Sequence, residues 1–169
     1  MLITETYRQQ NQQLHEQNEH YGTSGHKWAA TIEELAGAMR TSDILDYGCG
    51  KQTLKGILPY VRGYDPCIPG LDDEPFPADI VVCTDVLEHI EPDCLDAVLD
   101  DLRRVTGSAL FATVATGPAK KILPDGRNAH LIQRPYDWWL PKFWARFDVQ
   151  SFHNMGGEFL VIANAMYRS

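Results

Sequence analysis

The stretch ILDYGCGK, residues 44–51, decides how the fold is read. Ile44, Leu45 and Tyr47 make a short apolar run typical of a buried strand, and Gly48 and Gly50 follow it almost at once. Glycine is the residue that adopts positive φ most readily, and it lets another group come close to the backbone. The pattern therefore predicts a strand that ends in a sharp turn, and it raises the question of what approaches that turn.

Strand-like and helix-like segments alternate along the rest of the chain. Apolar runs predict strands at 44–47, 61–65, 79–85 and 108–116, and two closing strands at 146–154 and 159–166 joined by Gly156-Gly157. Helical spacing predicts helices at 26–40, 92–105 and 135–146, a polar helix at 5–20, and a short helix or turn after residue 51. This order predicts an α/β sheet with helices on both faces and an antiparallel C-terminal hairpin.

The bulk composition is that of one soluble globular domain. The 169 residues are 44% hydrophobic and 22% charged, and no apolar run approaches the ~18 residues of a membrane span. We expect a polar N-terminal helix or flap at 1–25 and a single domain at 26–169. Four cysteines without a CxxC pair indicate reduced thiols, and with no signal-peptide pattern at the start they favour a cytoplasmic protein.

Charge is unevenly distributed along the chain. The net charge of −8 disfavours general nucleic-acid binding, because affinity for phosphate backbones comes from Lys and Arg. Residues 117–146 nevertheless hold six basic and two acidic residues, a local charge of +4. Such a positive segment on an acidic protein marks a place where an anion could bind.

Acidic residues close three of the predicted strands. Asp46, Asp65 and Asp85 end or nearly end the first, second and third of them. Ligands of doubly wound sheets bind outside the carboxyl ends of the strands, at the point where strand order reverses. An acid that closes the second strand is suited to a ribose, because one carboxylate accepts hydrogen bonds from two hydroxyls.

Together, DYGCGK, GYDP and ADIVVCTDVLEHIEP resemble the class I S-adenosylmethionine-dependent methyltransferases, with a likeness that covers about residues 43–165. The resemblance is to short, divergent bacterial and phage members. It implies a Rossmann-like sheet, S-adenosyl-L-methionine (SAM) as cofactor and S-adenosyl-L-homocysteine (SAH) as product. It also implies that Asp46, Gly48 and Gly50 line the methionine end, that Asp65 holds the ribose, and that Pro66, Thr84, Asp85, Val86 and Leu87 border ribose and adenine. The glycines would then let the backbone approach the cofactor.

One segment departs from the family's pattern. Between the second strand and the next buried one, the family places a helix and a further strand, whereas here only PCIPGLDDEPFPA intervenes. Its four prolines exclude a continuous helix. We expect a sheet that has lost this edge unit, or that keeps only a stub near residues 71–76.

The acceptor is predicted from residues beyond the fourth and fifth family strands. His89 and His130 are the candidate catalytic bases, because both fall at the cofactor end of the sheet. The long loop at 116–134 is expected to form the acceptor wall. A small anionic acceptor, a metabolite or a nucleotide, would be held there by Lys120, Lys121, Arg127 and Arg134, with Trp138 as a stacking face. The motifs of DNA amino- and C5-methyltransferases are absent from their usual place, so an ordinary DNA-base methyltransferase is disfavoured.

Other interpretations stay open. Asp85, Glu88, His89 and His130 form a pattern similar to the metal-binding cluster of small-RNA 3′-terminal 2′-O-methyltransferases, although DVLEHI is also frequent in metal-free enzymes, and a metal-free site is the main expectation. A catalytically inactive SAM- or SAH-binding module that serves a partner enzyme is a further alternative. A dinucleotide enzyme is disfavoured, because Thr53 stands where GxGxxG needs its third glycine.

Overall fold

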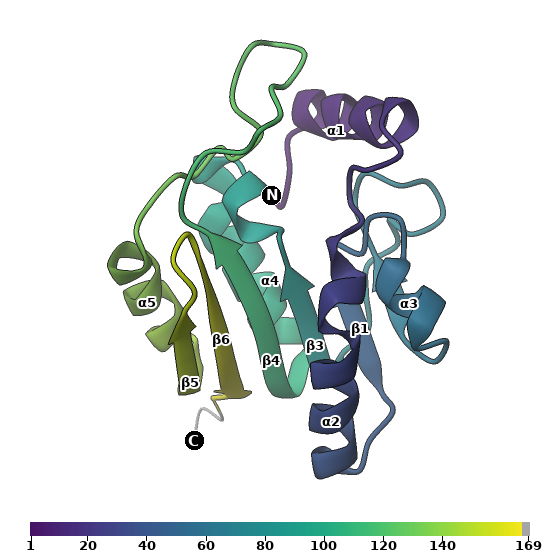
Figure 1. Cartoon of the computed structure of the whole chain (residues 1–169), viewed down its shortest axis with the longest axis vertical. Coiled ribbons are helices and arrows are strands. Elements are labelled where there is room, and N and C mark those ends of the chain that lie inside the picture. Colours follow the sequence, from purple (N-terminus) through teal and green to yellow (C-terminus); the bar gives the residue numbers. More distant parts are fainter. Residues whose placement is uncertain (167–169) are drawn as a thin grey trace.

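A single six-stranded sheet forms the centre of the molecule (Figure 1). The computed structural model describes residues 1–166. The strands lie in the order β2-β1-β3-β4-β6-β5, and their bounds are β1 Ile44–Tyr47, β2 Arg62–Tyr64, β3 Ala78–Thr84, β4 Thr106–Ala115, β5 Phe147–Asn154 and β6 Glu158–Ala165. The first four strands are parallel, and β6 runs antiparallel to both β4 and β5. The predicted α/β sheet with an antiparallel C-terminal hairpin is confirmed.

Five α-helices accompany the sheet in the described residues: α1 Glu5–Gln17, α2 Ala29–Met39, α3 Thr53–Ile57, α4 Leu95–Val105 and α5 Tyr136–Trp144. Short 3₁₀ turns cover Ser24–Trp28, Leu87–His89 and Pro92–Cys94. The helices expected at 26–40 and 92–105 are therefore each divided, with a 3₁₀ turn before α2 and another before α4. Within residues 1–166, none of the helices has the length and apolar character needed to cross a bilayer.

The two faces of the sheet bury separate hydrophobic clusters, because alternate residues of a strand point to opposite sides. From β3, Ile80 and Val82 pack with α2 and α3, whereas Val81 and Cys83 pack with α4 and α5. All four side chains are fully buried. This explains why β3 is apolar from Ile80 to Cys83, as expected for a parallel strand covered on both faces. Figure 1 shows α2 and α3 on one side of the sheet and α4 and α5 on the other.

The sheet ends at β2, which pairs only with β1 among the described strands. Residues 65–77 form turns and irregular chain, so the edge unit is absent as expected, and no helix or strand remains as a stub near residues 71–76. Arg62 secures this edge by donating to the Asp43 carboxylate at 3.0 Å and to the Pro77 carbonyl at 2.9 Å. The prolines of this segment account for its lack of helix.

Helix α1 and the loop after β4 lie beyond the carboxyl ends of the parallel strands (Figure 1). A small third cluster joins them: Tyr7 packs with the buried Leu123 and Ala129 of the loop. The Tyr7 hydroxyl also donates to the His89 carbonyl at 2.6 Å, and Thr4 donates to the Glu91 carboxylate through its backbone N–H (2.9 Å) and its hydroxyl (2.8 Å). The N-terminal segment is thereby docked onto the exit of β3.

Candidate functional site

A cavity of about 510 Å³ opens at the carboxyl ends of β1, β2 and β3. The chain passes from β1 to β2 on one side and continues through β3 on the other, so this is the point where strand order reverses. The turn after β1, the segment after β2, the segment after β3, the loop after β4 and the N-terminal segment all contribute to the wall. A volume of this size is in the range of small-molecule sites.

The glycine turn lines the cavity, but its glycines are required by contacts within the protein. Gly48 has φ +80° and Gly50 has φ +49°. A Cβ at Gly48 would meet the side chain of Val86, and a Cβ at Gly50 would meet the backbone of Gly22, 2.7 Å from its Cα. The space on the Cβ side of each glycine is thus occupied by the chain itself, while the backbone of the turn lines the cavity.

Asp65 holds this turn in place from the end of β2. One carboxylate oxygen accepts the Gly50 N–H at 3.0 Å, and the other accepts the Cys67 N–H at 2.9 Å. Each oxygen keeps a further lone pair, so the carboxylate can still accept hydrogen bonds from a ligand. Asp65 is 6% exposed and forms part of the cavity wall.

Asp46 is buried behind the turn, with 3% of its surface exposed. Burial, and secondly the negative charge of Asp65, raise the pKa of Asp46 to about 7. This carboxyl group is therefore a site where a nearby positive charge would favour ionisation. Like Asp46, Thr84 and Leu87 are buried, and none of these three expected cofactor contacts forms part of the cavity lining.

Asp85 follows β3 in a left-handed backbone conformation, with φ +60°. Its Oδ2 accepts a hydrogen bond from the Ser24 hydroxyl at 2.8 Å. Burial would raise the pKa of Asp85, but the hydrogen bond from Ser24 and the adjacent His89 outweigh this and leave it lowered. The carboxylate therefore faces the cavity as an anion.

Glu88 is fully buried beneath this corner. Its Oε1 accepts the Ala115 N–H at 2.7 Å, whereas Oε2 has no hydrogen-bond partner among residues 1–166. Burial, and secondly the Asp85 charge, raise the pKa of Glu88 well above its ordinary value. Glu88 does not belong to the group of converging metal-ligand atoms, so the structure assembles three of the four residues of the alternative metal pattern.

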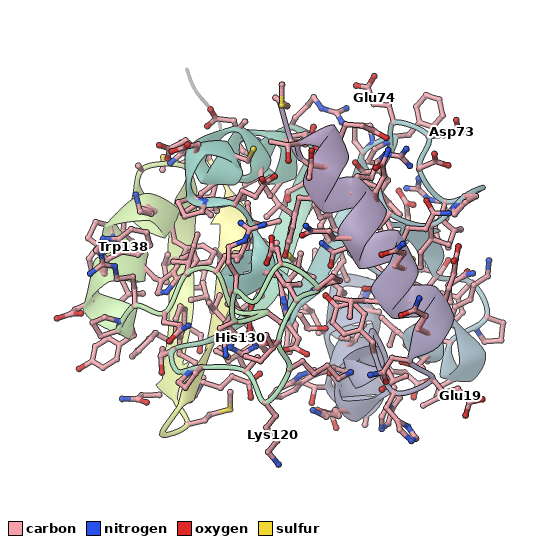
Figure 2. All side chains as sticks on the ribbon, turned by 90° about the horizontal axis from the view of Figure 1, so that it is seen from above. Glu19, Asp73, Glu74, Lys120, His130 and Trp138 are labelled. Atoms are coloured by element: carbon pink, nitrogen blue, oxygen red, sulfur yellow. The ribbon has the colours of Figure 1, made fainter. Side chains whose placement is uncertain are left out.

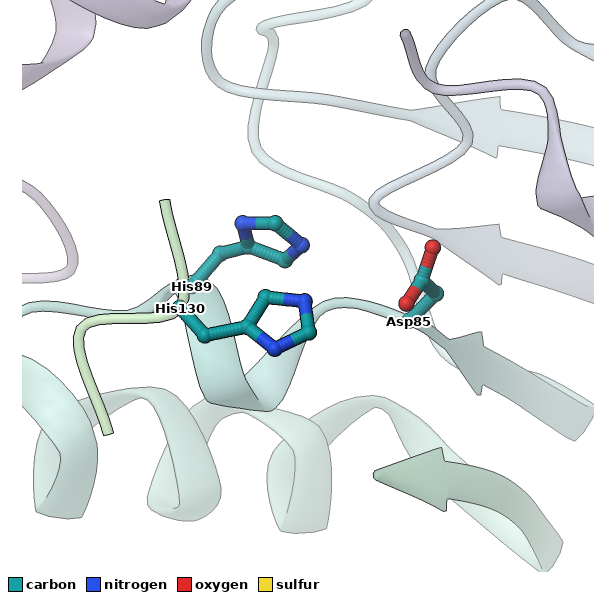
Figure 3. A group of neighbouring side chains, drawn as sticks. All are labelled: Asp85, His89 and His130. Atoms are coloured by element: carbon teal, nitrogen blue, oxygen red, sulfur yellow. The ribbon is translucent and has the colours of Figure 1, made fainter. Parts of the chain in front are cut away.

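Those three residues are Asp85, His89 and His130, whose ligand atoms lie within 4.8 Å of one another. Figure 3 shows both imidazole rings directed toward the Asp85 carboxylate. The rings are perpendicular, with centroids 4.7 Å apart. Burial lowers the pKa of His89 to about 4, and the nearby His130 adds to this, so His89 is neutral at neutral pH. His89 and His130, predicted from segments about forty residues apart, do meet in one corner of the cavity.

The N-terminal segment supplies a wall that the sequence did not predict in detail. Tyr7, Asn11 and His15 of α1 line the cavity, together with His20 and Tyr21 from the following turn. The Tyr21 hydroxyl donates to Asn11 Oδ1 at 2.8 Å. Ser24 and Lys27 line the cavity as well. In the sequence, Tyr7 and Tyr21 stand out only as isolated aromatic residues in a polar stretch, so local pattern does not indicate this wall.

The expected acceptor residues separate into two groups. Lys120 and Lys121 line the cavity, and the Lys121 ammonium lies 4.7 Å from the centre of the Tyr21 ring. Arg127, Arg134 and Trp138 are not part of the lining: Arg127 pairs with Asp125 at 2.7 Å, and Arg134 lies over Trp138. Seen from above, Trp138 lies at the far side of the molecule from α1, and Lys120 and His130 belong to the loop between them (Figure 2).

Known proteins resemble the chain in structure rather than in sequence. No protein-family model matches the sequence, and no curated protein is significantly similar to it. The chain is similar to Burkholderia thailandensis 1,6-didemethyltoxoflavin N1-methyltransferase, solved with its substrate and SAH, with 12% identity, a TM-score of 0.64, and 86% of this chain and 80% of that one covered.

Two further solved structures give the same picture. Magnesium protoporphyrin IX methyltransferase from Synechocystis PCC 6803, solved with SAH, has 15% identity and a TM-score of 0.56, with 83% of each chain covered. The methyltransferase domain of bacterial CtHen1 has 11% identity and a TM-score of 0.59, with 80% of this chain and 96% of that one covered. The strand order, the cavity at the switch point and these likenesses lead to one conclusion: the chain has the Rossmann-like fold of the class I SAM-dependent methyltransferases.

Proposed function

We propose that the protein is a SAM-dependent methyltransferase that transfers a methyl group to an oxygen or nitrogen atom of a small anionic acceptor. The observation that carries this proposal is the cavity at the switch point, lined by the turn at Gly48 and Gly50 and by the carboxylates of Asp65 and Asp85. SAH or SAM is bound in solved methyltransferases of the same fold.

The cofactor end of the site is assigned to the strand ends. In this proposal the ribose hydroxyls donate to the remaining lone pairs of Asp65, and Pro66, Asp85 and Val86 complete the wall around ribose and adenine. The buried Asp46 lies behind the turn and supplies negative charge near the cationic methionine end. Thr84 and Leu87 support this wall from the core.

The acceptor end is assigned to the loop after β4. Lys121 brings positive charge to the cavity, which suits a carboxylate or phosphate. Lys120 also borders the cavity, but its side chain extends outward (Figure 2), so it would meet only an acceptor that reaches the cavity mouth. His89 and His130 are the proposed proton acceptors, because an attacking O–H or N–H must lose its proton as the methyl group is transferred. Arg127, Arg134 and Trp138 stand outside the cavity lining, so they would contact only a part of the acceptor that extends beyond it.

Calorimetry with SAM and with SAH tests the cofactor assignment. We expect saturable binding to the wild-type protein and loss of at least ~10-fold in affinity for Asp65→Ala, since a single lost charged hydrogen bond is worth ~1.5–3 kcal/mol. Asp73→Ala is the matched control: it removes an exposed carboxylate from the segment after β2 and should bind both ligands like wild type. Circular dichroism of each variant shows whether it is folded.

The outcomes distinguish the candidate functions. Absence of binding to either ligand in the folded wild-type protein would overturn the proposal. Binding followed by SAH release with one of a panel of small phosphates and carboxylates would establish the reaction. Tight binding of both ligands with no turnover across that panel would instead support the second candidate, an inactive SAM- or SAH-binding module.

A further inference from the structure

We propose that Asp85, His89 and His130 form a binding site for a divalent transition-metal ion at the acceptor end of the cavity. The three side chains come from two separate segments, the exit of β3 and the loop after β4, and their ligand atoms lie within 4.8 Å of one another. One carboxylate oxygen and two imidazole nitrogens are a ligand set typical of such ions. All three residues line the same cavity.

The orientation of His130 is fixed in the way that suits a metal ligand. Its Nδ1 lies 2.7 Å from the Gly117 carbonyl oxygen, a contact in which the nitrogen must donate a proton. The neutral ring then carries its lone pair on Nε2, the other nitrogen. Metal-binding histidines commonly donate their second ring N–H to a backbone carbonyl, which sets both the tautomer and the direction of the ring.

An unpartnered polar atom at the same corner provides independent support. His89 Nδ1 is buried and has no hydrogen-bond partner in the described part of the chain. Buried polar groups are almost always satisfied, so an unsatisfied imidazole nitrogen beside converging ligand atoms indicates an absent binding partner.

The donors also indicate the kind of ion. Imidazole suits ions such as Fe²⁺, Co²⁺ and Zn²⁺, and the carboxylate also admits Mn²⁺, whereas Mg²⁺ and Ca²⁺ prefer sites made of oxygen alone. Three protein ligands leave coordination positions open toward the cavity. Ser24 holds Asp85 by its Oδ2, and the carboxylate can bind an ion through its other oxygen while keeping this hydrogen bond.

The catalytic consequence rests on the proposed function and narrows it to an oxygen acceptor. A hydroxyl bound to the ion would lose its proton to solvent more easily, because the positive charge stabilises the alkoxide. The oxygen then forms a bond to the methyl carbon of SAM, the carbon–sulfur bond breaks, and its electron pair stays on sulfur to give SAH. His89 and His130 would in that case act through the ion rather than as direct bases.

Binding of Mn²⁺ and Co²⁺, each added alone to protein freed of metal with a chelator, tests the site. Electron paramagnetic resonance of Mn²⁺ and the visible absorption of Co²⁺ report coordination without any need for activity. We expect one ion per chain in the wild-type protein and at least ~10-fold weaker binding in His130→Ala and in Asp85→Asn. His153→Ala is the matched control, since that exposed histidine lies on β5 and should leave metal binding unchanged.

The site fails if the folded wild-type protein shows no saturable binding, or if His130→Ala and Asp85→Asn bind as tightly as His153→Ala. Failure here is distinguishable from failure of the cofactor assignment. Asp65→Ala should lose SAM and keep the ion, and His130→Ala should lose the ion while SAH still binds. The Co²⁺ spectrum responds to the type of ligand. Removal of one histidine should therefore change the spectrum of any Co²⁺ that still binds, in the way expected for the loss of one nitrogen ligand.

Discussion

Gly50 lies against the backbone of Gly22. The sequence predicts a glycine turn at this position, but it does not reveal that a contact with Gly22 is what requires the glycine. The run at 44–47 followed by glycine was enough to place the strand and its turn. The partner of Gly50 is twenty-eight residues earlier in a polar stretch, so no local pattern identifies it. The same is true of Gly48 and the side chain of Val86.

Replacing Gly50 with alanine should destabilise the protein by roughly 1–3 kcal/mol, because the new Cβ requires both a left-handed backbone and displacement of Gly22. Urea denaturation measures this. Gly56→Ala is the control: Gly56 lies within α3 and a Cβ there has nothing within 4 Å, so this change should be neutral or stabilising by ~0.5–1 kcal/mol. Equal effects of the two substitutions would contradict the role of the Gly22 contact.

Asp46 gives the stability of the protein a predicted pH dependence. Its pKa of about 7 in the folded protein lies above the ordinary value of 3.8, so between those values the folded state holds a proton that the unfolded state has released. The free energy of unfolding should therefore fall as pH rises from about 4 to about 7, by at most ~4 kcal/mol from this group.

The comparison of wild type with Asp46→Asn isolates that contribution. Asparagine does not titrate, so the variant lacks this contribution. As pH rises, the free energy of unfolding of wild type should therefore fall relative to that of Asp46→Asn. Urea denaturation at about pH 5 and about pH 8 measures it. A difference that is independent of pH would mean that Asp46 ionises in the folded protein as it does in the unfolded chain.

At the level of elements, hydrophobic periodicity predicted the sheet, but it did not predict how α1 and the loop after β4 pack together beyond the carboxyl ends of the strands. The apolar run of β3 and the helical spacing of apolar residues in α4 each fit only one kind of element. The sequence therefore predicts the positions of both within a few residues. The association of α1 with the loop after β4 depends on Tyr7 of the helix and on Leu123 and Ala129 of the irregular loop. Local sequence indicates that such residues exist but not which distant segment they meet.

Leu123→Ala should loosen α1 and the loop after β4 together, because Leu123 is 3% exposed and packs in the only cluster that joins them among the three described. Hydrogen exchange measured by mass spectrometry should rise in residues 5–17 and 117–131 and stay unchanged in β3 and β4. Ile122→Ala is the matched control, since Ile122 is 56% exposed. Faster exchange confined to the loop would show that α1 is held independently by Tyr7 and Thr4.

For the molecule as a whole, the sequence predicted the loss of the edge unit, because the four prolines after β2 exclude the helix that this unit needs. It did not predict the closure of the cavity, which depends on how the N-terminal segment docks onto the exits of β1 and β3. Lys51 illustrates this docking: its ammonium donates to the His15 carbonyl at 2.6 Å and its backbone N–H donates to the Gly22 carbonyl at 2.8 Å. The sequence pattern suggests four metal-binding residues, and only the fold shows that Glu88 accepts the Ala115 N–H and stays outside the converging group.

The two buried faces should unfold as one unit, because the strands between them contribute side chains to both. Ile32→Ala on the α2 face and Leu99→Ala on the α4 face each remove a fully buried side chain and should lower the free energy of unfolding by ~2–5 kcal/mol. Leu35→Ala, at a half-buried position of α2, should have a smaller effect.

Urea transitions followed by far-UV circular dichroism and by tryptophan fluorescence should coincide in every variant, because Trp28 and Trp139 report on opposite faces. Separate transitions in either core variant would mean that each face, with its own helices, can unfold while the sheet persists.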